Sequence, residues 1–410
     1  MWTKPWTFKE GFTIGGGLLT VGFMLDYCVG AISWEAFAFP INIIILIVYL
    51  MFMMAIYALQ HKIYAFRFIG SYISAISALA YAALLTIIMG LTRQGIGEQN
   101  YDNVFGFQRM LSFWPFVMIY IWMSVVVAQV TIKRIVHFRW KEIPFLLNHA
   151  GLLIVLLCAT LGYADMQRYK MTTQLSFPEW RAFDEKSNMH ELPIAIQLKD
   201  FTINEYPPKL ILVDAKTGTP IPSKEVEPLL LDSTFKSGKL QDWSITINKL
   251  LDEAAPMMTK DTTNYLSWHS SGAVTAANIT AQSKDGKQKK TGWITCGSYQ
   301  FPYQILALDD KVSIAMPERE PQRYISKVEI MTEKGKHETA IIEVNKPYII
   351  EGWKIYQVSY NEKMGKWSNT SVLELVKDPW LPAVYSGIFM MLLGAVCMFI
   401  TPKRKKENQP

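Results

Sequence analysis

Residues 146–162 read Leu-Leu-Asn-His-Ala-Gly-Leu-Leu-Ile-Val-Leu-Leu-Cys-Ala-Thr-Leu-Gly, an apolar run that carries a single imidazole. The run extends over about 145–163, close to the roughly 20 residues with which a helix crosses about 30 Å of hydrocarbon. Five further runs are of similar length and composition, at about 11–31, 39–59, 70–92, 111–132 and 381–401. The sequence therefore predicts about six membrane-spanning helices.

The composition supports this interpretation. Half of the 410 residues are apolar and only 19% are charged, and the mean hydropathy is +0.13. These values exclude an ordinary soluble enzyme, and the 13% of aromatic residues excludes a disordered chain. The net charge of +6 comes from basic residues that flank the apolar runs, and no nucleic-acid-binding module is present. The composition thus indicates a membrane protein with a substantial water-facing part and no nucleic-acid partner.

The short connections between the runs predict the orientation, because loops rich in Lys and Arg stay in the cytoplasm. The N-terminal segment, the second and fourth connections and the C-terminal tail together hold twelve Lys and Arg residues, whereas the alternate short loops hold only Arg93 and Arg109. Both termini are therefore expected in the cytoplasm. The long segment from about 164 to 380 is then expected on the outer side.

That long segment has the pattern of β-structure. Apolar and polar residues alternate over Leu192–Lys199, Trp243–Asn248 and Tyr324–Ile330, which is typical of strands with one buried face. Lys-Thr-Gly-Thr-Pro at 216–220, Lys-Asp-Gly-Lys at 284–287 and Glu-Lys-Gly-Lys at 333–336 supply turn glycines. A final pair of predicted strands, 353–360 and 371–376, flanks the Asn-Glu-Lys-Met-Gly-Lys turn at 361–366 like a hairpin.

Cysteine usage excludes several kinds of chemistry. Cys28, Cys158 and Cys397 lie in apolar runs, which leaves Cys296 without a disulfide partner in the polar segment. The sequence contains no CxxC, CxxCH, HExxH or Walker motif and no arrangement like a Ser/His/Asp triad. Thiol redox chemistry, a cysteine zinc site and covalent attachment of haem to this chain are therefore unsupported.

His149 is the candidate functional residue. It lies inside the fifth apolar run, about 6 Å beyond the expected cytoplasmic start of that helix. An ionisable residue within a membrane helix is costly to insert and is by default a functional candidate. Its neutral imidazole can bind haem iron or another metal, or relay protons. The structural alternative is a histidine that is hydrogen-bonded across helices or partly hydrated near the interface.

Other candidates are weaker. Asp26, near the outer end of the first run, is either a proton-relay group or an ordinary interfacial acid, and the second interpretation is favoured. Gly11 and Gly15 form a small-residue face that predicts close helix packing. The remaining histidines lie in polar or basic surroundings and are expected to be solvated, and several tryptophans at run ends, Trp380 among them, fit an aromatic belt. The histidines of this group are His61, His137, His190, His269 and His337.

Three segments together resemble one known family. They are Asn-His-Ala-Gly-Leu-Leu-Ile-Val-Leu-Leu-Cys-Ala-Thr-Leu-Gly at 148–162, Val-Asn-Lys-Pro-Tyr-Ile-Ile-Glu-Gly-Trp-Lys-Ile-Tyr-Gln-Val-Ser-Tyr at 344–360, and Lys-Asp-Pro-Trp-Leu-Pro-Ala-Val-Tyr-Ser-Gly at 377–387. The chain resembles the ResB family, also called CcsB, of cytochrome c biogenesis proteins. The similarity covers about residues 70–402 and is strongest after 320.

The resemblance implies a role in the System II pathway in the bacterial inner membrane. There, a ResB-type subunit and a CcsA-type subunit form a complex that carries haem outward and attaches it to the CxxCH cysteines of apocytochrome c. It also implies that His149 is an axial ligand of haem b, held transiently and shared with the partner. The implied domains are a five-helix region at 1–163, a periplasmic β-rich domain at 164–380, a helix at 381–402 and a basic cytoplasmic tail at 403–410.

Two departures from the family pattern limit what this chain does alone. The first two apolar runs precede the four-helix pattern of ResB, and their role is unassigned. The chain also lacks the tryptophan-rich WWD motif and the flanking outer histidines of a CcsA-type protein. We therefore expect an accessory subunit of a holocytochrome c synthase that needs its partner.

Two other functions are alternatives to haem export. In the first, the chain is a scaffold that binds no haem and only stabilises the CcsA-type subunit, with His149 as a packing residue. In the second, it is a small-molecule transporter, which is disfavoured because Asp26 and His149 are almost the only ionisable groups in the runs and no inverted repeat is visible.

Overall fold

Each of the six apolar runs forms a helix, as predicted. The computed structural model describes residues 2–95, 106–222, 227–232, 236–258 and 263–400, so the expected tail at 403–410 lies outside the described residues. Within these ranges, six helices are long and apolar enough to cross a membrane. They are α1 (Phe8–Val29), α2 (Ile41–Leu59), α4 (Tyr72–Leu91), α5 (Trp114–Val136), α6 (Ile143–Gly162) and α7 (Leu381–Ile400), and a short helix α3 (Tyr64–Ile69) joins α2 to α4.

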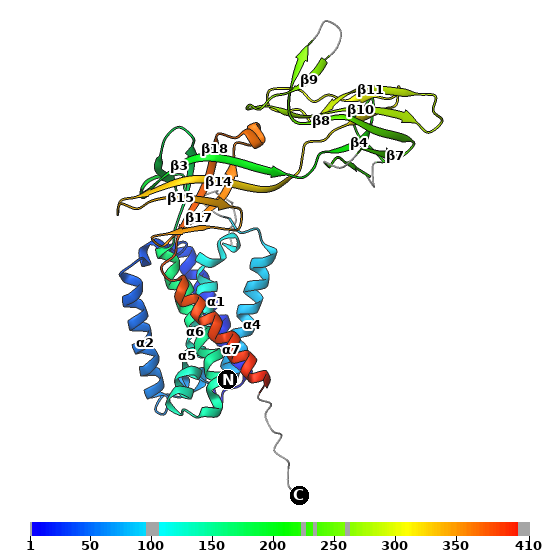
Figure 1. Ribbon diagram of the computed structural model, residues 1–410. Coiled ribbons are helices and arrows are strands. Elements are labelled where there is room, and N and C mark those ends of the chain that lie inside the picture. The colour runs from blue at the N-terminus through cyan, green and yellow to red at the C-terminus, as the bar shows by residue number, and fades with distance from the viewer. Residues whose placement is uncertain (1, 96–105, 223–226, 233–235, 259–262, 401–410) are drawn as a thin grey trace. The chain divides into compact units, whose positions relative to one another are not determined.

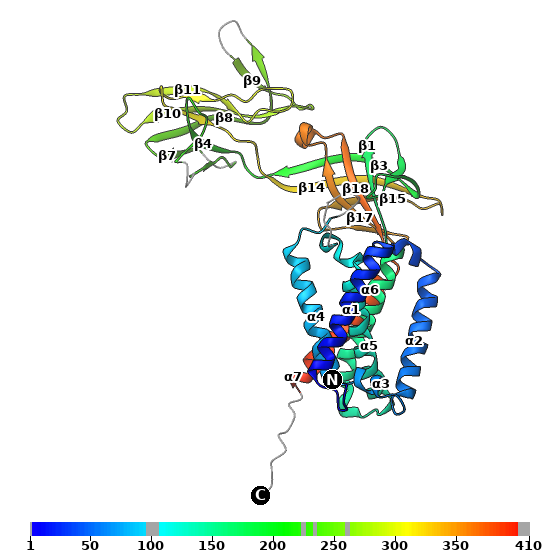
Figure 2. The same cartoon turned by 180° about the vertical axis from the view of Figure 1, so that it is seen from behind.

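The chain divides into two compact units. The helical unit contains residues 1–168 and 376–410, and the β-rich unit contains residues 169–375. In the helical unit, α5 packs against both α2 and α4, which lie on opposite sides of it (Figures 1 and 2). Half of the apolar window of α5 is buried, a larger share than in any other of these helices, so α5 is the central helix of this unit.

Small residues let the helices of this unit approach closely. A Cβ atom added to Gly11 or Gly15 would collide with Ser77 or Tyr81 of α4, so the expected packing role of these glycines is confirmed. The same principle applies where α6 crosses α7. A Cβ atom on Gly151 would lie 2.5 Å from the carbonyl oxygen of Gly387. Backbone therefore meets backbone at this crossing.

Asp165, just beyond α6, joins the ends of three helices. Its carboxylate accepts hydrogen bonds from the backbone N–H of Phe39 at 2.7 Å, from Nδ2 of Asn42 at 2.8 Å and from Nε1 of Trp380 at 2.7 Å. These donors belong to the start of α2 and to the segment that enters α7. We call Asp165, Phe39, Asn42 and Trp380 the carboxylate clasp. It ties α2 to the α6–α7 pair.

The β-rich unit contains the predicted strands. The three alternating segments fall in β3, β8 and β14, and the final pair forms the neighbouring strands β17 and β18. Gly218, Gly286 and Gly335 occupy the predicted turns with positive φ angles of 70°, 72° and 83°. The strands are β1 (Gln167–Gln174), β2 (Glu179–Phe183), β3 (Met189–Glu205), β4 (Lys209–Asp214), β5 (Pro220–Ile221), β6 (Leu229–Leu230), β7 (Ser237–Leu240), β8 (Trp243–Met258), β9 (Thr263–Ser267), β10 (Val274–Ser283), β11 (Lys289–Thr295), β12 (Leu306–Ala307), β13 (Val312–Ala315), β14 (Pro321–Thr332), β15 (His337–Glu343), β16 (Tyr348–Ile350), β17 (Trp353–Tyr360) and β18 (Thr370–Lys377).

These strands form three sheets. The first has the order β15-β14-β3-β2-β1-β18-β17-β16, and its inward side chains, such as Ile196, Val328 and Leu373, form one core. The other two sheets have the orders β11-β10-β8-β7, with β9 paired to β8, and β12-β13-β4-β5, with β6 paired to β4. Leu212 and Ile279 come from these two sheets and share a second core. The two sheets therefore pack face to face.

Candidate functional site

His149 lies on α6, six residues after the helix begins at Ile143. At 1.5 Å per residue, this places it about 9 Å along the helix axis from that end. The helix begins two residues earlier than the apolar run suggested, so His149 lies slightly further inside than expected. Its side chain is half-buried. The imidazole is therefore partly open to whatever surrounds the helical unit.

One hydrogen bond indicates which nitrogen of this imidazole carries a hydrogen atom. Nδ1 of His149 lies 3.1 Å from the backbone carbonyl oxygen of Phe145, one helical turn earlier. Because a carbonyl can only accept, Nδ1 carries the hydrogen, and in the neutral ring Nε2 then keeps its lone pair. Nε2 has no hydrogen-bond partner among the described residues. A histidine that binds a metal commonly donates its other N–H to a carbonyl in this way.

Phe145 contacts the ring of His149 directly, and Arg134 contacts Phe145. Phe145 stacks on His149 with ring centroids 3.8 Å apart and planes inclined by 20°. Arg134, in the last turn of α5, lies over the Phe145 ring at 4.8 Å and pairs with Glu142 at 2.5 Å. Composition and spacing alone did not single out these three residues. The only signal was that Phe145 precedes His149 by four positions, which is the spacing of neighbours on a helix face.

Asn148 has a different role from its neighbour. Its Nδ2 donates to the carbonyl oxygen of Met391 in α7 at 3.2 Å, on the face where α6 crosses α7. Successive residues of a helix point in different directions, so Asn148 packs α6 against α7 while His149 faces elsewhere.

Within the described ranges of the chain, no other histidine forms a hydrogen bond or ring contact with His149. Among the described residues there is no group of three or more His, Cys, Asp or Glu side chains that could hold a metal ion. His61 and His137 are exposed at helix ends. The remaining three lie in the β-rich unit and each contacts one carboxylate: His190 contacts Asp184, His269 contacts Glu253 and His337 contacts Glu329.

The second ionisable candidate, Asp26, forms an ion pair. Its Oδ2 lies 2.9 Å from Nη2 of Arg109, in the segment that precedes α5. Trp380 likewise has a specific partner, the carboxylate of Asp165, which the aromatic-belt interpretation did not anticipate. All four cysteines are free, in agreement with the expected absence of a disulfide.

A comparison with protein families identifies the chain. The model of the ResB-like family matches residues 138–371, more than half of the sequence, and the match includes His149 and most of the β-rich unit. The chain belongs to the ResB-like family. A search of curated proteins finds no match to this ResB-like chain. Family membership indicates an involvement in cytochrome c biogenesis.

The match is narrower than the similarity expected at about 70–402. It leaves out helices α1, α2, α4 and α5 and also the closing segment at 377–387. In this ResB-like chain the closing segment at 377–387 has a structural role at the start of α7. Asp378 accepts hydrogen bonds from the backbone N–H groups of Trp380 and Leu381, each at 3.0 Å, and so caps the start of α7. Trp380 joins the carboxylate clasp.

Proposed function

We propose that this protein is the ResB-type subunit of a cytochrome c biogenesis complex of the System II kind. With a CcsA-type partner, it would bind haem, carry it outward across the bacterial inner membrane and present it for covalent attachment to apocytochrome c. The observation that carries the proposal is the geometry at His149: Nδ1 lies 3.1 Å from the Phe145 carbonyl oxygen, and Nε2 has no hydrogen-bond partner among the described residues.

In this proposal haem b is the cargo and His149 is one axial ligand. Neutral imidazole is a common ligand of haem iron, and the Phe145 carbonyl raises its basicity through the hydrogen bond at Nδ1. Phe145 keeps the ring from rotating because the two rings stack. The second axial histidine would come from the CcsA-type partner, since the described part of this chain brings no other histidine to the site.

The placement in the membrane belongs to the same proposal. The six apolar helices make this a membrane protein, and the distribution of Lys and Arg favours cytoplasmic termini and a periplasmic β-rich unit. His149 then lies nearer the cytoplasmic end of α6, where haem would be taken up. The β-rich unit would dock the partner or apocytochrome c, and catalysis of attachment would belong to the assembled complex.

The test is the absorption spectrum of the complex co-purified with a CcsA-type partner. His149→Ala should lose the low-spin haem signal, and added imidazole should restore it, because free imidazole can replace the missing ligand. His137→Ala is the matched control. Its Nδ1 makes the same kind of bond, to the Lys133 carbonyl at 3.2 Å, but at an exposed helix end. Haem retained by the His149 variant would contradict the ligand role.

A scaffold that binds no haem is the second candidate, and the packing of α6 favours it. The Gly151–Gly387 crossing and the carboxylate clasp connect α6 to α7 and α2 whether or not haem binds. If the chain is only a scaffold, the His149→Ala complex should keep its full haem content, because this chain does not bind haem. Deletion of residues 164–380 should then abolish assembly of the complex. The spectrum of the His149 variant therefore separates the two candidates.

A further inference from the structure

Strand β3 extends beyond its partner on one side. β14 pairs with β3 from Ile194 to Glu205, whereas β2 pairs with it only from Met189 to Ile196. Among the described residues, no other strand pairs with β3 on the β2 side, and no side chain bonds to its backbone there. We call residues 197–205 the free edge of β3. Backbone groups on such an edge can pair with an added strand.

The free edge forms one wall of a cleft with a volume of about 1200 Å³. Six consecutive residues of β3, 200–205, line it. Residues 250–253 of β8 and residues 366–369, at the turn between β17 and β18, line other sides. Six strand residues extend over about 20 Å. A cleft that follows a strand for this length suits an extended chain better than a compact small molecule.

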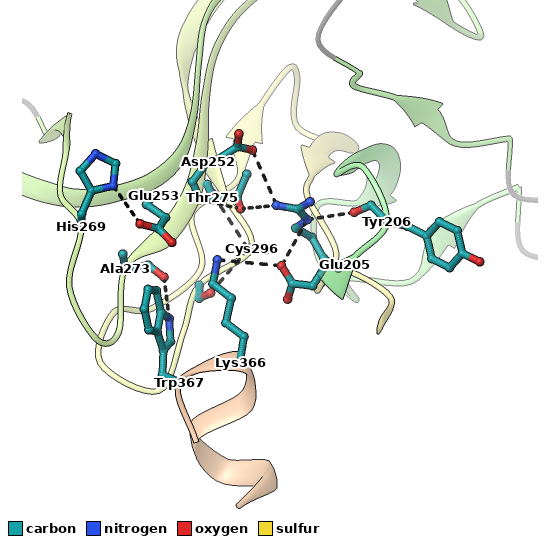
Figure 3. Close-up of polar contacts among 12 residues, drawn as sticks. Glu205, Tyr206, Asp252, Glu253, His269, Ala273, Thr275, Cys296, Lys366 and Trp367 are labelled. Atoms are coloured by element: carbon teal, nitrogen blue, oxygen red, sulfur yellow. Dashed lines mark hydrogen bonds and ion pairs between the residues drawn. The ribbon is translucent and has the colours of Figure 1, made fainter. Parts of the chain in front are cut away.

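The cleft carries more acidic than basic side chains. Its lining holds Asp200, Glu205, Asp252 and Glu253 against Arg319 and Lys366. Both cations are paired within the cleft. Arg319 lies 3.4 Å from Glu205, and Lys366 lies 3.9 Å from the same carboxylate (Figure 3). Glu205 is thus already paired with cations. The excess negative charge of the lining therefore lies on the other three carboxylates.

Two carboxylates on different walls are open to a ligand. Asp200 accepts a hydrogen bond from the Thr202 hydroxyl at 2.9 Å and has no cationic partner among the described residues. Asp252 forms an ion pair with Arg319 at 3.7 Å, but its side chain is 78% exposed, so a ligand can reach this carboxylate. Glu253 faces His269 at 2.9 Å. The charge that a ligand meets at Asp200 and Asp252 is therefore negative.

We propose that the free edge of β3 binds an extended polypeptide segment rich in Lys or Arg, which adds as a strand and sets its cations against Asp200 and Asp252. Main-chain hydrogen bonds supply affinity in such additions, and alternate side chains supply specificity. The inference rests on the docking role proposed for the β-rich unit and gives that role a partner chemistry. It does not depend on haem binding at His149.

The test uses the full chain in detergent and a fluorescent peptide of about ten residues that alternates Lys and Thr, long enough to cover the edge. This peptide should bind, and its Glu/Thr counterpart should not. Two further peptides carry N-methyl groups on odd or on even residues. Only one of them should lose binding, because a strand turns alternate N–H groups toward its neighbour. Equal binding of the two methylated peptides, or no binding of the Lys/Thr peptide, would overturn the proposal.

Protein variants test the position of the site. Asp200→Asn combined with Asp252→Asn should weaken binding about tenfold, as the loss of two ion pairs of about 0.7 kcal/mol each predicts. Asp242→Asn is the control, because this exposed acid of the same unit lies outside the cleft and faces Lys284 at 3.9 Å. Unchanged affinity in the double variant would contradict the assignment. His149→Ala should bind the peptide normally, so failure of the haem proposal and failure of this one are distinguishable.

Discussion

At the scale of single residues, the hydrogen bond at Nδ1 decides what His149 can do. The sequence marked this residue because an imidazole is unusual in an apolar run. It did not show which ring nitrogen is available, since that depends on the partner of the other nitrogen. The Phe145 carbonyl settles the tautomer, and Phe145 also fixes the plane of the ring.

The pKa of Asp184 makes the stability of its turn depend on pH. Burial acts to raise the pKa of Asp184, but hydrogen bonds from Asn188, His190 and the backbone of the turn outweigh it and bring the pKa from 3.8 to about 2. Because the folded pKa is lower than the unfolded one, the carboxylate stabilises the turn above about pH 4 and this stabilisation is lost as the pH falls toward 2.

We therefore expect hydrogen exchange in residues 183–190 to accelerate, relative to intrinsic rates, between pH 4 and pH 2 in the wild type. Asp184→Asn should remove most of this pH dependence, because the amide does not titrate. Asp242→Asn should keep it. Mass spectrometry of the peptide that covers this turn gives the measurement, and a variant with the same acid dependence as the wild type would contradict the role of Asp184.

At the scale of secondary-structure elements, the crossing of α6 and α7 depends on glycine. Gly151→Val places side-chain atoms against the backbone of Gly387, and overpacking of this kind costs about 1–3 kcal/mol. We expect a lower thermal unfolding temperature in detergent. Gly90→Val is the matched control, because apart from the adjoining backbone of its own helix no described atom lies within 4 Å of a Cβ atom at that position. Equal stability of the two variants would contradict the close crossing.

The carboxylate clasp also connects secondary-structure elements, because it joins α2 to α6 and α7. The family match at residues 138–371 does not include the first two apolar runs, and the sequence alone leaves their role unassigned. Asn42, at the start of α2, donates to the carboxylate of Asp165, to which Trp380 also donates. Helix α2 is therefore joined to the α6–α7 pair by specific hydrogen bonds as well as by apolar packing.

At the scale of the whole molecule, the distribution of positive charge makes a prediction about the two sides of the membrane. In a chain without its four native cysteines, Lys216→Cys in the β-rich unit should react with a membrane-impermeant maleimide in spheroplasts. Lys62→Cys, between α2 and α3, should react only after permeabilisation. Both positions are exposed, so accessibility within the fold does not limit the reaction. The reverse pattern of labelling would overturn the proposed orientation.

Local patterns in the sequence predict the helices and strands of this protein and its candidate functional residue. Six apolar runs gave six helices, alternation gave strands β3, β8 and β14, and glycines marked three turns. These features are local, because the length, periodicity and backbone preference of a segment depend on its own residues. The unusual position of His149 was visible for the same reason.

The contacts between these residues depend on the three-dimensional fold. Trp380 and Asp165 are 215 positions apart in the chain, and the free edge of β3 exists because β2 is shorter than the strand beside it. Arg134 reaches Phe145 because α5 packs against α6. Such contacts depend on which faces of distant elements pack together, and this is a property of the whole fold that no local pattern contains.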